Sequence, residues 1–135
     1  MVEMELNKII IDEKRHDQVI VLREKGGNRR LPIIIGFLEA SSIKMKVSGM
    51  QPPRPLTHDL LKSVIENLDG KLEKVVVDKL QDNTFHAKLL IKQDGKIKTV
   101  DARPSDSIAL AVRTKTPIFV EEEVLEKASS LKEEL

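Results

Sequence analysis

Two stretches of the chain share one pattern: Arg54-Pro55-Leu56-Thr57-His58-Asp59-Leu60-Leu61 and Asp101-Ala102-Arg103-Pro104-Ser105-Asp106-Ser107-Ile108. Each runs Arg-Pro, then a hydroxyl residue beside an aspartate, then an apolar helical pattern. Proline holds the residue before it extended, so each arginine is expected on an incoming strand or loop. Thr57 and either Ser105 or Asp106 are then predicted to cap a helix N-terminus. The pattern therefore predicts two junctions at which a helix begins directly after an arginine.

Each junction places an arginine and a carboxylate beside the unpaired backbone N–H groups that open a helix. Helix N-termini bind anions, and the guanidinium adds a planar fork that fits phosphate. The sequence therefore predicts that Arg54 and Arg103 bind phosphate or a similar anion.

Hydrophobic periodicity and turn residues predict the remaining elements. Strands are expected at residues 2–11, 18–23, 31–35, 72–80, 84–91, 96–102 and 116–120, and helices at 39–47, 57–68, 105–114 and 121–135. Pro32 has no N–H to donate, so its strand is expected to begin there or to lie at a sheet edge. Helices interrupt hairpins without regular alternation, which predicts an α+β fold with a mostly antiparallel or mixed sheet and about four helices.

The length of 135 residues fits a single domain, here residues 1–135. The chain carries 23 Lys and Arg against 22 Asp and Glu, so it lacks the basic excess typical of nucleic-acid-binding modules. It also has no Trp or Tyr, which removes the usual platform for stacking single-stranded bases. Any contact with nucleic acid is therefore expected to be local, or assembled across an oligomer.

Further features of the composition concern location and chemistry. The absence of Cys excludes disulfides, thiolate metal sites and cysteine nucleophiles. No apolar run approaches the roughly 18 residues of a membrane span, and the first residues do not resemble a secretory signal. We therefore expect a cytoplasmic protein that does not enter the membrane. The Lys- and Glu-rich composition is typical of heat-adapted proteins.

Three residues of the two motifs carry candidate chemistry, and each has a structural alternative. His58 is predicted either as a general base or a phosphate contact, or as a polar first-turn residue beside Asp59. Asp101 and Asp106 flank a strand end and are predicted either to hold a cation such as Mg²⁺ or Mn²⁺, or to lock against Arg103. The sequence alone leaves both alternatives open.

Five ordered blocks resemble the bifunctional nuclease domain family over about residues 3 to 125. The blocks are Leu31-Pro32-Ile33-Ile34-Ile35-Gly36, Glu39-Ala40, Arg54 to Leu61, Asp101 to Ala111, and Pro117-Ile118-Phe119-Val120. Plant members of this family are described as having both DNase and RNase activity, often with an additional C-terminal domain.

The resemblance implies a nuclease that acts on DNA or RNA, and it implies roles for the motif residues. His58, Asp59 and Asp106 would be catalytic, with His58 as the acid or base. Arg54 and Arg103 would bind phosphate. Asp101 and Asp106 would hold the cation, or one of them would orient His58.

A second interpretation of the same residues is a non-enzymatic, oligomeric module that binds a small anionic ligand or a protein partner. The near-zero net charge favours this alternative. The last predicted helix carries an apolar stripe of Val124, Ala128, Leu131 and Leu135 that is suited to a partner subunit. We therefore expect a homo-oligomer, at least a dimer.

Overall fold

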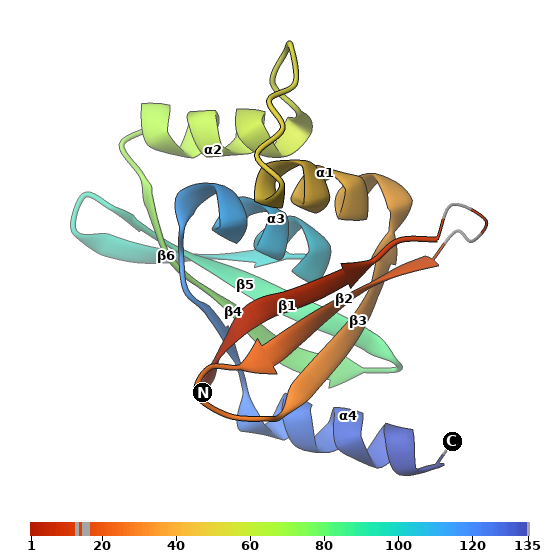
Figure 1. Cartoon of the computed structure of the whole chain (residues 1–135). Coiled ribbons are helices and arrows are strands. Elements are labelled where there is room, and N and C mark those ends of the chain that lie inside the picture. The colour runs from red at the N-terminus through yellow and green to blue at the C-terminus, as the bar shows by residue number, and fades with distance from the viewer. Residues whose placement is uncertain (13, 15–16, 135) are drawn as a thin grey trace.

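The computed structural model describes residues 1–12, 14 and 17–134, with side chains as far as residue 130. These residues form seven strands and four helices in one α+β domain (Figure 1). The strands are β1 (Val2–Ile10), β2 (Asp17–Glu24), β3 (Arg30–Gly36), β4 (Lys71–Gln81), β5 (Thr84–Gln93), β6 (Lys96–Ala102) and β7 (Ile118–Val120). The helices are α1 (Phe37–Val47), α2 (Thr57–Asn67), α3 (Pro104–Thr114) and α4 (Glu122–Glu134).

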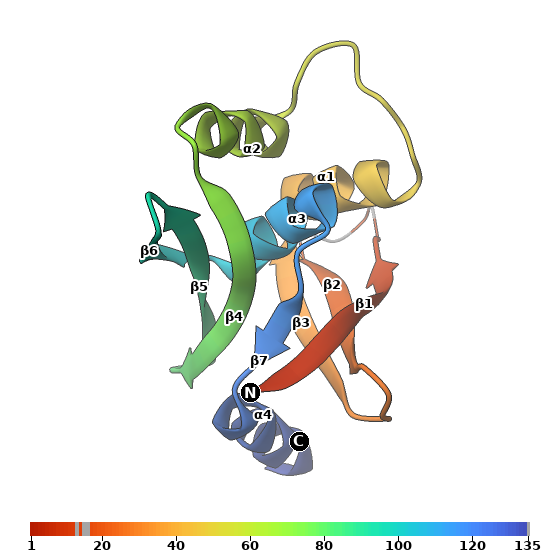
Figure 2. The same cartoon turned by 90° about the vertical axis from the view of Figure 1, so that its left-hand side faces the viewer.

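The seven strands form one sheet in the order β3-β2-β1-β7-β4-β5-β6. The first three strands and β4 to β6 each form an antiparallel meander, as the hairpin pattern predicts. The short β7 joins the two halves because it pairs antiparallel with β1 and parallel with β4. Figure 2 shows the two halves on either side of β7. The prediction of a mostly antiparallel sheet is therefore confirmed.

Local sequence explains where the strands turn and end. Asp82 and Asn83 both have positive φ, 51° and 61°, which is the backbone of the tight turn that suits a two-residue hairpin. Asp94 and Gly95 repeat this arrangement between β5 and β6. Pro32 lies in β3, which is an edge strand of the sheet, as its missing N–H predicts.

Helix α3 is the central helix of the fold. It packs against α1 and α2 on one side and against β4 and β5 on the other (Figures 1 and 2). Small residues on α3, including Ala109 and Ala111, let it approach the sheet closely, and Ile108 and Leu110 are fully buried in the core. Helix α4 lies at the opposite end of the molecule from α2 (Figure 1). The central position of α3 holds its N-terminus against α1 and α2.

Few elements differ from the sequence-based expectation. Helix α1 begins at Phe37, two residues before the expected start, and α4 begins at Glu122. Val124 and Leu125 of α4 are buried, and Ala128 is half-buried, so part of the predicted stripe belongs to this chain's own core. Leu135 and the side chain of Leu131 lie outside the described residues. No helix in the described part of the chain is long and apolar enough to cross a membrane.

Candidate active site

The two Arg-Pro motifs begin helices α2 and α3, but the caps differ from those expected. Leu56 is the N-cap of α2 and Arg103 is the N-cap of α3, so the predicted caps Thr57, Ser105 and Asp106 are wrong. In α2, the Asp59 carboxylate accepts the backbone N–H of Leu56 at 2.9 Å and so supports the helix start from within. In α3, Pro104 occupies the first helical position, where its missing N–H costs nothing. Neither helix therefore needs a hydroxyl side chain at its cap.

The packing of α3 against α2 brings His58 and Asp106 together. The two residues are 48 positions apart in sequence, yet His58 Nε2 lies 2.8 Å from Asp106 Oδ1. The other ring nitrogen, Nδ1, lies 2.7 Å from the hydroxyl of Ser42 on α1. His58 is only 8% exposed, so the ring is enclosed between three helices. The structure therefore joins two of the predicted catalytic residues in one hydrogen-bonded pair.

Arg103 completes the outer part of this cluster. Its Nε donates to Asp106 Oδ2 at 2.8 Å, and its Nη2 lies 3.2 Å from Glu39 Oε1 on α1. The side chain of Arg103 is 66% exposed, whereas that of Asp106 is 30% exposed. We name Glu39, His58, Arg103 and Asp106 the Arg103 cluster. It presents a guanidinium to solvent and a carboxylate behind it.

A second arginine lies behind the Arg103 cluster and is almost completely buried. Arg113 Nε donates to Asp59 Oδ1 at 2.7 Å, and Nη2 donates to Ser42 Oγ at 2.9 Å. Its remaining bonds go to the carbonyl oxygens of Ala109 at 3.0 Å and Ser42 at 3.3 Å. Arg113 thus ties α3 to both α1 and α2. Asp59, a predicted catalytic residue, is engaged in this support.

Hydrogen bonding determines the charge state of both aspartates. Burial acts to raise the pKa of the Asp106 carboxyl, but the bonds from Arg103 and His58 outweigh burial and hold that pKa below its usual value. Burial opposes ionisation of Asp59 in the same way, and the bonds from Leu56 and Arg113 lower its pKa. Both carboxylates are therefore charged at neutral pH.

These lowered pKa values predict acid-sensitive stability. As pH falls, the unfolded chain takes up protons at these carboxyls near pH 4, before the folded chain does. The stability that the two carboxylates contribute is therefore present above about pH 4, and it is lost as pH falls through their lowered pKa values in the folded protein. As pH falls, we expect the free energy of unfolding of Asp106→Asn to decrease less per pH unit than that of the wild type. Urea unfolding from about pH 6 to about pH 2 measures this. Asp94→Asn, in an exposed turn, is the control, and an Asp106→Asn slope equal to that of the control would contradict the assignment.

The structure places Arg54 and Asp101 apart from these contacts. Arg54 is exposed in the segment before α2, and within the described residues it makes no ion pair. Asp101 lies on β6 with its side chain 76% exposed, and its Oδ1 accepts from Lys88 at 2.7 Å. That bond lowers the pKa of Asp101. The predicted phosphate contact of Arg54 stays a prediction.

The same geometry bears on the expected Mg²⁺ or Mn²⁺ site. Both oxygens of Asp106 already accept hydrogen bonds, one from His58 and one from Arg103. One oxygen of Asp101 accepts a hydrogen bond from Lys88. No group of three or more His, Cys, Asp or Glu suited to a metal ion occurs among the residues that the structure describes. Hard cations require several converging oxygen ligands. The side chains as arranged do not fit a resident cation on Asp101 and Asp106, and the metal stays a prediction.

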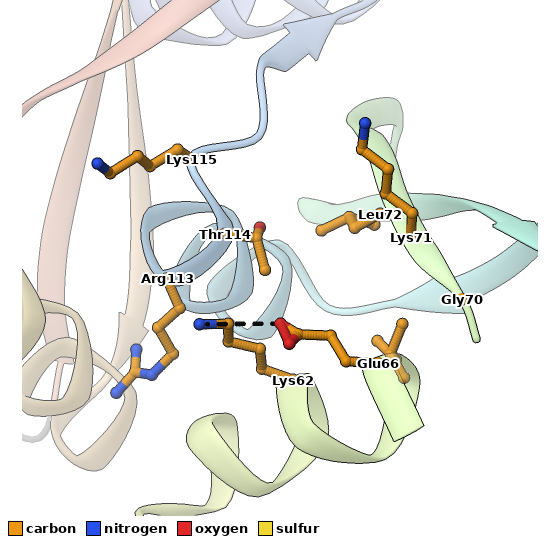
Figure 3. A pocket seen from close by; sticks show the side chains of 9 residues that line it. Lys62, Glu66, Gly70, Lys71, Leu72, Arg113, Thr114 and Lys115 are labelled. Atoms are coloured by element: carbon orange, nitrogen blue, oxygen red, sulfur yellow. Dashed lines mark ion pairs between the residues drawn. The ribbon is translucent and has the colours of Figure 1, made fainter. Parts of the chain in front are cut away.

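A cavity of about 330 Å³ lies on the other side of Arg113, between α2 and the end of α3. Figure 3 shows that Lys62 pairs with Glu66 there, whereas Lys71 and Lys115 point away from each other. The Arg113 side chain turns away from Lys115, toward α1. The cations around this cavity therefore do not converge on one point, and the Arg103 cluster remains the stronger candidate site.

Sequence reasoning missed Ser42 and Arg113. Ser42 was one of several serines without a motif, and Arg113 lies near the end of a helix where a basic residue is ordinary. The available signal was an arginine on a helix face otherwise made of buried small and apolar residues.

Residues 20–133 match the family described as "Bifunctional nuclease domain". An uncharacterized protein of Mycobacterium tuberculosis is 45% identical over 131 residues, which cover 97% of this chain and 78% of that protein.

Plant relatives are more distant and much longer. Bifunctional nuclease 2 of Oryza sativa is 31% identical over 114 residues, which cover 82% of this chain and 35% of that protein. Bifunctional nuclease 1 of Arabidopsis thaliana is 28% identical over 112 residues, which cover 81% of this chain and 34% of that protein. This chain therefore matches about a third of each plant protein.

Proposed function

This chain belongs to the bifunctional nuclease domain family, and from this premise we propose that it hydrolyses phosphodiester bonds in DNA or RNA without sequence preference. The observation that carries the proposal is the exposed guanidinium of Arg103, which is held beside the ionised carboxylate of Asp106. Hydrolysis of a phosphodiester needs a group that stabilises negative charge and a group that orients the attacking water.

Arg103 is suited to the first task. Its Nε and Nη2 are held by Asp106 and Glu39, which fixes the plane of the guanidinium. A fixed planar fork stabilises the charge that develops on phosphoryl oxygens without reorganising during the reaction. We assign Arg103 to phosphate binding, with Arg54 as a second, exposed candidate from the neighbouring junction.

Asp106 is suited to the second task. Its side chain is partly exposed, and each carboxylate oxygen keeps a lone pair beyond the bonds from His58 and Arg103. A low pKa makes Asp106 a weak base but ensures that it accepts a hydrogen bond from water at neutral pH. Asp106 therefore orients the water, while Asp59 supports the helix that carries His58.

Cleavage of labelled single- and double-stranded DNA and RNA tests this proposal. The substrates are incubated with the protein in Mg²⁺, in Mn²⁺ and in EDTA. We expect cleavage products from more than one of the four substrates, at similar rates for unrelated sequences. Cleavage in Mg²⁺ or Mn²⁺ that is lost in EDTA would support the predicted cation. Absence of products in every condition would contradict the nuclease.

The alternative, a module that binds a small anionic ligand or a protein partner, is favoured by one observation. Glu39 and Asp106 balance the charge of Arg103, so the cluster does not present a strongly positive surface. Binding of an anion without hydrolysis would support this alternative. The cytoplasmic location and the homo-oligomer stay predictions.

A further inference from the structure

Arg113, Ser42, His58 and Asp106 form a continuous chain of hydrogen bonds from a buried guanidinium to a partly exposed carboxylate. The heavy-atom distances along it are 2.9 Å, 2.7 Å and 2.8 Å. A guanidinium can only donate hydrogen bonds. The Ser42 oxygen therefore accepts from Arg113, which leaves its own hydroxyl hydrogen free to point at His58 Nδ1.

The contact of His58 Nε2 with Asp106, on the other side of the imidazole, agrees with a hydroxyl hydrogen of Ser42 that points at Nδ1. An ionised carboxylate can only accept, so the close approach of Asp106 Oδ1 requires a proton on His58 Nε2. The neutral ring with its proton on Nε2 satisfies both neighbours at once, because Nδ1 then accepts from Ser42. Every donor in the chain meets an acceptor.

This arrangement leaves the histidine without a free ring nitrogen. Both nitrogens are engaged, and the residue is 8% exposed between α1, α2 and α3. A general acid or base needs hydrogen-bond reach to the substrate or to one intervening water. Arg103 and Asp106, by contrast, are accessible at the outer side of the cluster.

We infer that His58 is a positioning residue: Ser42 and Arg113 hold its neutral imidazole with the proton on Nε2, and that N–H orients Asp106. The inference rests on the proposed function only where it concerns catalysis. The proton arrangement is a property of the folded protein and is testable whether or not the protein is a nuclease.

The first test is a two-bond ¹H–¹⁵N correlation spectrum of ¹⁵N-histidine-labelled protein at neutral pH. His16→Gln/His86→Gln protein contains His58 as its single histidine, so its signals need no further assignment. We expect a protonated Nε2 and an unprotonated Nδ1, and a displaced Nδ1 signal when Ser42→Ala is added. Protonation of Nδ1, alone or together with Nε2, would overturn the inference. An Nδ1 signal unchanged by Ser42→Ala would overturn the role of Ser42.

The second test separates positioning from proton transfer by comparing His58→Gln with His58→Ala. Glutamine can present an amide N–H to Asp106 but cannot act as an acid or base at neutral pH. We expect His58→Gln to retain the cleavage rate within about tenfold, and His58→Ala to fall by a further factor of about ten, once near-UV circular dichroism shows both folded. Equal losses of about 10²-fold or more in two folded variants would show that His58 transfers protons. If the wild type cleaves nothing, the proposed function fails, and the spectrum alone decides the proton arrangement.

Discussion

Replacing Arg113 with alanine is expected to lower the free energy of unfolding by about 3 kcal/mol, because it leaves the Asp59 carboxylate and the Ser42 hydroxyl without their partner. The Arg113 side chain is 3% exposed and its guanidinium meets four acceptors. Asp59 is one-third exposed and recovers part of its hydration, which keeps the loss near the lower end of the range for a broken buried pair. Urea unfolding at neutral pH measures the loss.

Arg103→Ala is the matched control for stability, since Arg103 also pairs with an aspartate but is two-thirds exposed. An exposed ion pair contributes little, so this variant is expected to lose less than about 1 kcal/mol. Equal losses for the two arginines would contradict the distinction between the buried support and the outer cluster.

The same Arg103→Ala variant is expected to lower kcat/KM for phosphodiester cleavage by about 10²- to 10³-fold, because removing one preorganised donor to the transition state has an effect of this size. Arg103→Lys keeps the charge but loses the planar fork, so its activity is expected to lie between those of the wild type and Arg103→Ala. Initial rates on labelled oligonucleotides at limiting substrate measure both variants.

Arg23→Ala is the control for activity. Arg23 is a partly exposed arginine on β2 that pairs with Glu5, and the proposal gives it no part in cleavage. It is expected to cleave at the wild-type rate. Wild-type rates for Arg103→Ala as well would remove Arg103 from the site.

The sequence predicted most of the fold because periodicity and turn residues act locally. The hairpin turns at Asp82-Asn83 and Asp94-Gly95 carry their own backbone preference. Helix α2 ends within one residue of the predicted end at residue 68, and Asp69, with a φ of 61°, takes the left-handed backbone that follows the helix. The helix caps were wrong because the reach of Asp59 back to Leu56, and Pro104 at the first helical position, made a hydroxyl cap unnecessary.

The candidate site was predictable only in part. The repeated motif indicated two helix starts with His58 and Asp106, and α3 brings them together. Which carboxylate an arginine contacts depends on tertiary packing, and both Asp101 and Asp106 lie within three residues of Arg103 in the sequence. In the fold Asp101 bonds across the strands to Lys88, because the two residues are register partners of β5 and β6.

Cleavage of a labelled oligonucleotide by wild type, Asp106→Asn and Asp94→Asn, purified identically and shown to be folded, tests the nuclease site most directly. The same chemical change is made in the Arg103 cluster and in an exposed hairpin turn. We predict cleavage by the wild type and Asp94→Asn at equal rates, and a loss of at least about tenfold in Asp106→Asn. Equal rates for all three proteins would contradict the site and point to another source of the activity.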